Sequence, residues 1–400
     1  MRCAFWISAI VIAYTYVGYP VWIWLCSKFG ARPWIRQEIH PTVSIIMAVH
    51  NGETLLREKI DHLLTLDYPP ELVEIIIVSD GSYDGTEQIL MELSHPRLRP
   101  IICREHRGKA AAVNEALRCA TGEILVFVDI RPRLEKEALR RLVSNFADPA
   151  VGCVAGELCL SNEGHDAGTT AVSGLYWRYE QWIRKSESMV DSPLGVYGGF
   201  YAVRRKLAAD MPEGLILDDM YEPLSIVRKG FRSVLDESAC VWDIWPKNSS
   251  LEFHRKVRTL AGNYQLLQVA PWLLGRANRL RWQLISHKVL RLFVPVLLMI
   301  AFGTSFTLRA SLPYLAFFIV QAFIYVLAVV GLMRDVPVLC RVSGPATAFC
   351  LLNAAAVVGF YRFVVYRREL WKIWVRPTRI APTRAARNDA GTIHRVSSKL

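Results

Sequence analysis

The chain has 400 residues, of which 52% are hydrophobic, and its 48 basic and 36 acidic residues give a formal net charge of +12. This composition excludes a disordered chain, a collagen and a disulfide-rich secreted scaffold, and it indicates a membrane protein with cationic flanks. The nine cysteines form no CxxC pair and no zinc-binding spacing. Such a scattered set is typical of buried, unpaired thiols in a reducing compartment.

The first apolar run covers residues 3–26 and contains no charged residue. It has about the length needed to cross a ~30 Å hydrocarbon core, and it is longer than the apolar part of a signal peptide. Several basic residues follow it, whereas only Arg2 precedes it. Because basic flanks favour the inner side of a membrane, we predict an uncleaved anchor over 1–27 and a cytoplasmic domain after it.

The strands predicted for the central domain alternate with helical patterns. They are Thr42–Val49, Glu74–Ser79, Ile101–Cys103 and Ile124–Asp129. Continuous apolar strands that alternate with helices predict an α/β domain whose mostly parallel sheet is covered on both faces. In such sheets, ligands bind beyond the carboxyl ends of the strands.

Two acidic residues stand where predicted strands end, and each has a candidate role. Asp80 can accept hydrogen bonds from a base or a ribose, whereas the nearby Asp84 and Thr86 suit a turn and a helix cap. Asp129 can hold a divalent cation on a diphosphate. Arg131 follows two residues later, and its guanidinium cannot bind a metal but can neutralise phosphate oxygens.

Two further motifs carry residues suited to group transfer. Asp218 and Asp219 are adjacent carboxylates, so on a regular element only one should face a site, as a general base or, alternatively, as a helix-capping acid. The stretch 198–201 (GGFY) suits either the lining of an acceptor cleft or a buried strand turn. Lys109 begins a predicted helix, where it and backbone N–H groups can meet a phosphate.

Three apolar stretches near the other end, 289–308, 312–333 and 344–366, are each long enough to span a membrane, and we assign 287–366 to this region. The tail over 367–400 holds nine Lys or Arg and two acidic residues. Since this excess charge lies beside membrane segments, attraction to anionic lipid explains it better than binding of nucleic acid. Four complete spans would put the tail opposite the central domain, so either one segment is re-entrant or interfacial, or the positive-inside rule fails here.

Seven motifs resemble, in order and spacing, the processive-type inverting glycosyltransferases of family 2, such as the catalytic cores of cellulose, hyaluronan and poly-N-acetylglucosamine synthases. They are TVSIIMAVHNGE, IIIVSDGSYDGT, RGKAAAVNEAL, ILVFVD, GGFYAVRR, LDDMYEPL and FHRKVRTLAGN, and they cover about residues 40–265. The resemblance implies a GT-A-type, Rossmann-like glycosyltransferase domain over 40–250, with N- and C-terminal transmembrane helices. It also implies interfacial or acceptor-side helices over 251–286, although a soluble helix packed on the domain would explain that segment as well.

The resemblance implies roles for individual residues. The nucleotide pocket would contain His50, Glu53, Asp80, Lys109, Asp129 and Arg131. Asp219 matches the general base that deprotonates the acceptor hydroxyl, and Asp218 replaces the glutamate that precedes it. The acceptor and diphosphate side would contain Gly199, Phe200, Arg204, Arg255 and Arg258.

Three departures from the family pattern bear on function. Arg131 replaces the second acid of the family's Asp-x-Asp motif, so the resemblance implies Mg²⁺ or Mn²⁺ at Asp129 but leaves the requirement for metal open. Arg255 and Thr259 replace the glutamine and tryptophan of the Gln-x-x-Arg-Trp motif. Because that tryptophan supports the terminal sugar of a growing chain, its absence weakens the case for processive polymerisation.

The expected function is transfer of a sugar from a nucleotide diphosphate donor, expected to be UDP-linked, to a growing glycan in cell-surface or extracellular polysaccharide synthesis. The expected place is the cell (inner) membrane, with lipids and other synthesis or export subunits as partners and no nucleic acid. One alternative is a single transfer to a lipid-linked acceptor. Another is a catalytically silent scaffold that binds sugar nucleotides. A nicotinamide oxidoreductase is disfavoured because HNGE, and no GxGxxG turn, follows the first strand.

Overall fold

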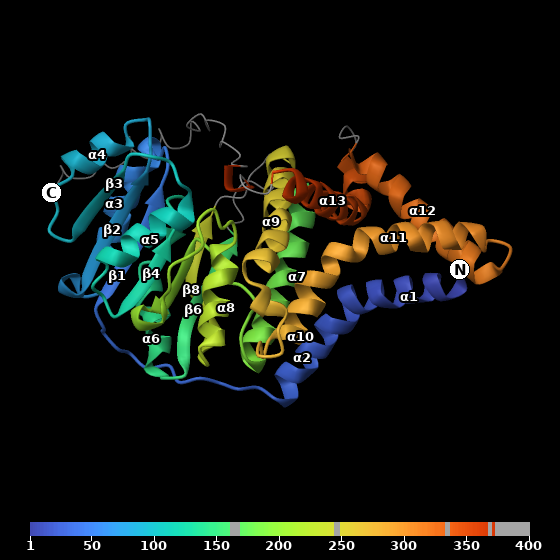
Figure 1. Cartoon of the computed structure of the whole chain (residues 1–400), viewed down its shortest axis with the longest axis horizontal. Coiled ribbons are helices and arrows are strands. Elements are labelled where there is room, and N and C mark those ends of the chain that lie inside the picture. The colour runs from blue at the N-terminus through green and yellow to red at the C-terminus, as the bar shows by residue number, and fades with distance from the viewer. Residues whose placement is uncertain (161–168, 244–248, 333–336, 367–369, 373–400) are drawn as a thin grey trace, which may run out of the picture.

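The computed structural model describes residues 1–160, 169–243, 249–332, 337–366 and 370–372. An α/β domain occupies one end of the molecule, and long apolar helices extend from the other (Figure 1). Helices α7 (Thr169–Val190) and α9 (Ser249–Val269) lie between the two parts.

The sheet of the α/β domain has eight strands in the order β3-β2-β1-β4-β7-β6-β8-β5. Strands β3, β2, β1 and β4 are parallel to one another, β7 is antiparallel to β4 and β6, and β8 is parallel to β6 and antiparallel to β5. Their bounds are β1 Val43–Val49, β2 Val73–Asp80, β3 Leu98–Cys103, β4 Ile124–Val128, β5 Arg133–Leu134, β6 Val151–Leu160, β7 Phe200–Arg204 and β8 Arg232–Asp243. All four strands predicted from the sequence are therefore present, and the predicted α/β fold is confirmed.

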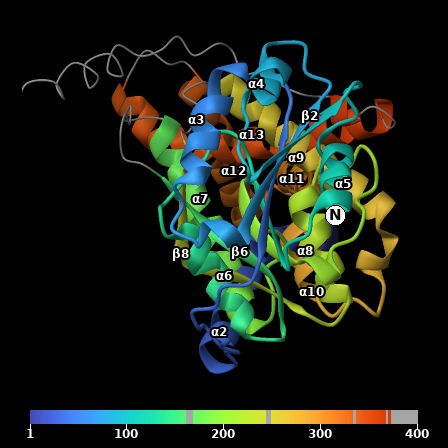
Figure 2. The same ribbon diagram turned by 90° about the vertical axis from the view of Figure 1, so that its left-hand side faces the viewer.

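Helices cover both faces of this sheet, because alternate residues of each apolar strand point to opposite sides. Ile46 and Ile76 pack with α5 and α8, whereas Ile45 and Ile75 pack with α3, α4 and α6. Figure 2 shows α3 and α6 on one side of the sheet and α5 and α8 on the other. The bounds are α3 Glu53–Leu64, α4 Thr86–Glu92, α5 Lys109–Cys119, α6 Ala138–Ser144 and α8 Asp218–Arg228.

The candidate site lies along one edge of the sheet. The carboxyl ends of β1, β2, β4 and β8 meet there, and β7 contributes its first residue because it runs in the opposite direction: Phe200 pairs with Val128. Residues far apart in the sequence are thereby brought to one edge, as is usual for ligand sites of α/β sheets.

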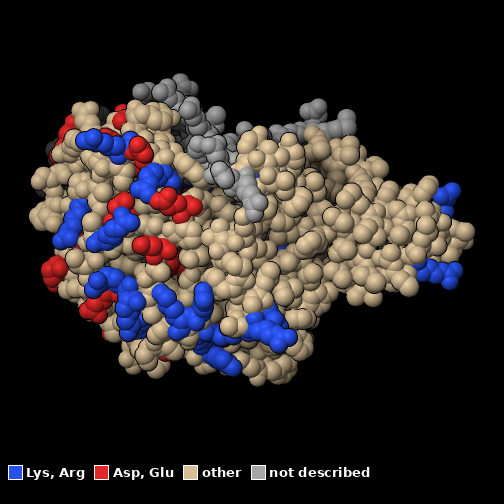
Figure 3. All heavy atoms as spheres, viewed as in Figure 1, with Lys and Arg blue, Asp and Glu red and all other residues tan. Residues whose placement is uncertain are grey.

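Four helices in the described part of the chain are long and apolar enough to cross a membrane: Arg2–Phe29, Arg281–Thr307, Leu312–Leu332 and Ser343–Val365. The first comprises α1 (Arg2–Ala13), a π-helical turn (Tyr14–Gly18) and α2 (Tyr19–Phe29), and the second comprises α10 (Arg281–Leu284), a π-helical turn (Ile285–Val289) and α11 (Leu290–Thr307). The third is α12 (Leu312–Leu332), and the fourth lies within α13 (Pro337–Val365). Figure 3 shows that charged side chains gather over the α/β domain and are absent from most of the visible helical surface. The length and composition of these four helices fit membrane-spanning segments.

The end of α13 returns to the α/β domain. Leu370, in a short 3₁₀ helix over Leu370–Lys372, is buried in the same core as α5 and α8, and the ring of Trp371 contacts His106. At the opposite end of the molecule, Thr307 lies beside Met1. The chain therefore returns to the side of the α/β domain after its last apolar helix.

Helix α9 makes up the first part of the segment 251–286. Its residues Val257, Ala261 and Leu266 are buried in the core shared with α5 and α8. Most of this segment is therefore a helix packed on the domain, whereas Trp282, at the start of the second apolar helix, is 60% exposed.

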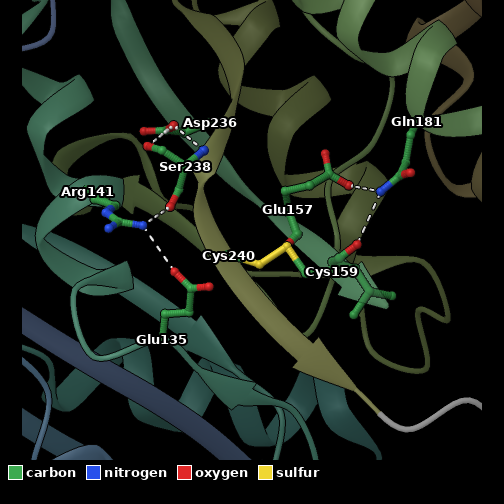
Figure 4. The surroundings of a disulfide bond; sticks show 9 residues. Glu135, Arg141, Glu157, Cys159, Gln181, Asp236, Ser238 and Cys240 are labelled. Carbon is green, nitrogen blue, oxygen red and sulfur yellow. Dashed lines mark hydrogen bonds and ion pairs between the residues drawn. A yellow bond between two sulfur atoms is a disulfide. The ribbon is translucent and has the colours of Figure 1, made fainter. Parts of the chain in front are cut away.

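Two cysteines form a disulfide, and for them the prediction of unpaired thiols is wrong. Cys159 and Cys240 lie on the neighbouring strands β6 and β8, with their Cα atoms 5.9 Å apart (Figure 4). They are 81 residues apart in the sequence, so their spacing alone gave no sign that these strands are adjacent. Among the free cysteines of the described residues, Cys153 is buried, whereas Cys3 and Cys119 are exposed.

Candidate active site

Asp80 organises the loop that precedes α5. Its carboxylate accepts hydrogen bonds from the backbone N–H groups of Arg107 (2.9 Å) and Gly108 (2.8 Å), and it lies 2.7 Å from Nδ1 of His106. Gly108 adopts φ +92°, a conformation that side chains with a Cβ rarely adopt. Because Asp80 is 3% exposed, its carboxylate supports the loop at the predicted nucleotide pocket.

A stacked pair of histidines lies at the same edge. The rings of His50 and His106 are parallel to within 18°, with centroids 3.8 Å apart, and Nδ1 of His50 lies 2.8 Å from the backbone oxygen of Asp80. The sequence analysis selected His50 but missed His106. The only signal for His106 was its place directly before the Arg-Gly-Lys sequence that begins α5.

Glu53 and Asp84 hold two adjoining helix starts together. Asp84 accepts hydrogen bonds from the backbone N–H groups of Glu53 (3.2 Å) and Thr86 (3.0 Å), and Glu53 accepts one from Gly85 (3.1 Å). The turn-and-cap interpretation of Asp84 is therefore confirmed. Glu53 lies at the predicted edge, and in this structure its carboxylate contacts backbone.

Lys109 joins the two halves of the site. Its ammonium lies 3.2 Å from Oδ1 of Asp129 and 2.9 Å from Oδ2 of Asp218. Although burial alone would lower the pKa of Lys109, the charges of these two carboxylates hold it well above its usual value. The ammonium is therefore permanently charged and is shared between a residue of the β4 edge and a residue of α8.

Asp219 is the strongest candidate for a general base. Burial, together with the negative charge of Asp218, raises the pKa of Asp219 to about 7, while Lys109 and Arg258 oppose the rise. A Cβ atom on Gly198 would lie 3.2 Å from that of Asp219, so a glycine there permits their close approach. A carboxylate with a pKa near neutrality can accept a proton and later release it, which is what base catalysis requires.

A second cationic group, Arg131, lies beside Asp243. The guanidinium of Arg131 is 3.6 Å from Oδ2 of Asp243, which also accepts a hydrogen bond from the Tyr197 hydroxyl (3.2 Å). Partial burial and the neighbouring charge of Arg131 lower the pKa of Arg255. The sequence analysis missed Tyr197 and Asp243, because only the pairing of distant strands brings them to Arg131.

Two predicted acceptor residues do not face the site, and these assignments are corrected. Phe200 begins β7 at this edge, but its side chain is fully buried in the core on the face of the sheet covered by α3, α4 and α6. Arg204 pairs with Ile124 at the opposite end of the sheet, where its guanidinium donates to the backbone oxygens of Val151 and Phe146. Gly199, by contrast, lies at the site, and its oxygen accepts a hydrogen bond from the N–H of Asp129.

Further polar groups are buried near Asp218 and Asp219. Glu222 is completely buried one helical turn after Asp218, and burial raises the pKa of its carboxyl to about 8. The hydroxyl of Tyr201 is also buried, and within the described residues neither group has a hydrogen-bond partner. Burial thus favours the neutral form of Glu222.

The residues around Asp129 are a poor match for a divalent metal ion. Mg²⁺ and Mn²⁺ prefer several oxygen ligands, whereas the groups beside Asp129 are the ammonium of Lys109 and, two residues along the chain, the guanidinium of Arg131. Within the described ranges, no three His, Cys, Asp or Glu side chains are grouped to hold a metal. A metal ion there would meet the ammonium of Lys109 as well as the carboxylates of Asp129 and Asp218.

Comparison with known proteins shows what this α/β domain is similar to. Residues 44–210 match the family model "Glycosyl transferase family 2". The match covers most of the α/β domain, which is therefore similar to the domains of family 2 glycosyltransferases over this range.

Curated relatives share the central part of the chain. A poly-beta-1,6-N-acetyl-D-glucosamine synthase of Staphylococcus aureus is 22% identical over 245 residues, which cover 60% of this chain and 59% of the relative. A beta-monoglucosyldiacylglycerol synthase of Synechocystis sp. is 26% identical over 293 residues, which cover 69% of this chain and 61% of the relative. The chain thus spans about three fifths of the length of the curated relatives that it matches.

A solved structure has the same fold over most of the chain. It is a mannosyltransferase from Pyrobaculum calidifontis in complex with GDP-Man and Mn²⁺, with a TM-score of 0.70 and 22% sequence identity. The likeness covers 91% of this chain and 100% of that one, so the shared fold includes apolar helices as well as the sheet.

Proposed function

We propose that the protein is a membrane-bound inverting glycosyltransferase that moves a sugar from a UDP-linked donor to a growing glycan. The observation that carries this proposal is Asp219, a carboxylate with a pKa near 7. It lies at the sheet edge that also holds the pocket shaped by Asp80. A base with this pKa beside such a pocket suits deprotonation of an acceptor hydroxyl.

The reaction is a single displacement. Asp219 takes the proton of the acceptor hydroxyl as its oxygen attacks the anomeric carbon, and the bond from that carbon to the diphosphate oxygen breaks. The charge that develops on the departing diphosphate is stabilised by Lys109 and Arg258. Attack from the side opposite the leaving group inverts the anomeric carbon, and no covalent intermediate between sugar and enzyme forms.

The names of two relatives support two kinds of acceptor. The synthase of Staphylococcus aureus is named for a polymer, which supports the growing glycan. The synthase of Synechocystis is named for a glucosylated lipid, which supports the second candidate, single transfer to a lipid-linked acceptor.

The test is release of UDP by the full-length protein in detergent, measured over a panel of UDP-sugars with and without Mg²⁺ or Mn²⁺. Asp219→Asn should lower turnover at least a thousandfold and leave UDP binding unchanged, because the amide cannot accept the proton. The matched control is Asp210→Asn, which changes an exposed aspartate away from the site. A ladder of products supports glycan growth, and one added sugar supports the lipid acceptor.

The silent scaffold makes the opposite prediction. Such a protein would bind UDP but release none from any donor, with or without added native lipids. Equal turnover by the wild type and Asp219→Asn would remove Asp219 from the mechanism.

We place the catalytic domain on the cytoplasmic side of the cell (inner) membrane, with other synthesis or export subunits as candidate partners. The basic residues after the first apolar helix support this side, whereas the Cys159–Cys240 disulfide opposes it, because disulfides are rare in the cytosol. The exposed thiol of Cys119 allows an experiment that distinguishes the cytoplasmic side from the opposite side of the membrane. A membrane-impermeant maleimide should label Cys119 only in permeabilised cells, and Cys119→Ser provides the blank.

A further inference from the structure

We infer that fixed cations of this chain, Lys109 and Arg131, neutralise the donor diphosphate in place of a divalent metal ion. The inference rests on the proposed nucleotide diphosphate donor, and it names the groups that meet the donor's charge. Two positions beside Asp129 hold a cation.

The first position is the space between Asp129 and Asp218. The ammonium of Lys109 fills it, 3.2 Å from one carboxylate and 2.9 Å from the other, and it also lies 3.4 Å from the backbone oxygen of Gly198. A cation shared by two carboxylates is the arrangement that a bound metal ion would provide. Here the chain supplies it as a side chain, at the start of a helix whose backbone N–H groups also favour anions.

The second position is that of Arg131, whose side chain is 41% exposed and therefore accessible to a ligand. The only carboxylate recorded beside its guanidinium in the described structure is Asp243, at 3.6 Å, and Asp243 is also engaged by Tyr197. The charge of Arg255 is close enough to Arg131 for the two to repel each other. Asp243 acts on both guanidiniums and offsets part of this repulsion, so the cluster keeps an excess of positive charge for a further anion, and the planar fork of arginine matches phosphate oxygens.

These cations suit the charge change of the reaction. When the bond between the anomeric carbon and the diphosphate oxygen breaks, both bonding electrons stay on the diphosphate, and the acceptor proton passes to Asp219. The new negative charge therefore appears on oxygens beside fixed cations that need no reorganisation. No further reactant is required, so the step balances without a metal ion.

The experiment uses the full-length protein in detergent, with UDP and GDP as probes and isothermal titration calorimetry as the readout. In the wild type, the Kd of the bound nucleotide in EDTA should lie within about threefold of that in Mg²⁺ or Mn²⁺. Turnover of the active donor should persist in EDTA.

Arg131→Asp supplies the sharper test, because it removes a cation and adds a possible metal ligand. This variant should bind the nucleotide at least tenfold more weakly than the wild type in EDTA, and Mn²⁺ should restore binding. Arg133→Asp makes the same charge reversal two residues later, at an exposed position paired with Glu58, and should leave nucleotide binding independent of metal. If Arg131→Asp does not fold, Arg131→Gln should show the weaker binding without rescue by Mn²⁺.

The inference is overturned if EDTA abolishes nucleotide binding or turnover of the wild type and Mg²⁺ or Mn²⁺ restores it. It is also overturned if neither variant of Arg131 weakens binding in EDTA. If neither UDP nor GDP binds under any condition, the proposed donor class fails, and this inference falls with it.

Discussion

The two halves of the sheet edge differ in how their polar groups are satisfied. On the side of β1 and β2, Asp80 accepts hydrogen bonds from two backbone N–H groups and contacts His106. On the side of β7 and α8, atoms of Asp219 and Glu222 are buried without a hydrogen-bond partner in the described structure. The polar groups of the first half have their hydrogen bonds satisfied, whereas in the second half burial without partners disfavours the charged form of the carboxyl groups.

Because of this difference, we expect the first half to serve nucleotide binding and the second half to serve the chemical step. Satisfied hydrogen bonds fix a shape and leave the pKa of a carboxyl low, whereas burial without partners raises the pKa toward the value that a base needs. Changes in the first half should therefore act on nucleotide affinity. Changes in the second half should act on rate, on pH dependence and on stability.

The largest effect on affinity is expected from Asp80→Ala. The change removes the acceptor that holds Arg107, Gly108 and His106, so the loop before α5 loses its shape. Since hydrogen bonds to a charged group contribute about 1.5–3 kcal/mol each, UDP binding should weaken by about a hundredfold or more, measured by calorimetry. Asp61→Ala, at an exposed position of α3, is the control. Unchanged affinity for UDP would contradict the assignment of nucleotide binding to the side of β1 and β2.

The pH dependence of turnover follows from Asp219, whose pKa burial raises to about 7. A base acts only when it is deprotonated, so kcat/KM should fall about tenfold per pH unit below pH 7 and level off above it. The measurement is a pH profile of UDP release between pH 5 and 9. A rate that stays constant down to pH 5 would contradict this assignment of the base.

Glu222→Gln should change stability more than rate. Burial raises the pKa of Glu222 to about 8, so the folded protein binds a proton that the unfolded chain releases above its ordinary pKa of 4.5. Stability therefore falls as pH rises from about 4.5 to about 8. The amide removes this dependence and should gain on the order of 2–3 kcal/mol at pH 7.

The measurement for Glu222→Gln is thermal unfolding in detergent between pH 5 and 8. The matched control is Glu213→Gln, an exposed residue in the loop before α8. Equal pH slopes for the wild type and Glu222→Gln would show that Glu222 is already charged in the folded protein.

The smallest effect is expected at the surface. Arg57 and Glu92 form an ion pair between α3 and α4, and both side chains are about half exposed. Exposed pairs contribute about 0.2–1 kcal/mol, so Arg57→Ala should shift the unfolding temperature by only a few degrees at most and leave UDP affinity unchanged. A large loss of affinity would mean that the nucleotide half is less rigid than its hydrogen bonds indicate.

The local pattern of the sequence determined much of the first half. An apolar run that ends in polar residues is visible in consecutive residues of the sequence. The strands β1, β2 and β4 and the edge residues His50, Asp80 and Asp129 could therefore all be predicted. The periodicity of α5 was equally local, and the helix predicted to begin at Lys109 does begin there in the structure. Short-range patterns suffice wherever one strand and its following helix carry the signal.

Tertiary structure decided the rest, because contacts between distant strands leave no local pattern. The reversal of β7 put Arg204 at the far end of the sheet, and the pairing of β6 with β8 joined Cys159 to Cys240 and brought Asp243 to Arg131. The placement of Lys109 between two carboxylates also required β4 and α8 to meet. The sequence by itself determined which chemical groups are present at the edge, whereas the fold determined which of them touch, since that depends on strand direction and register.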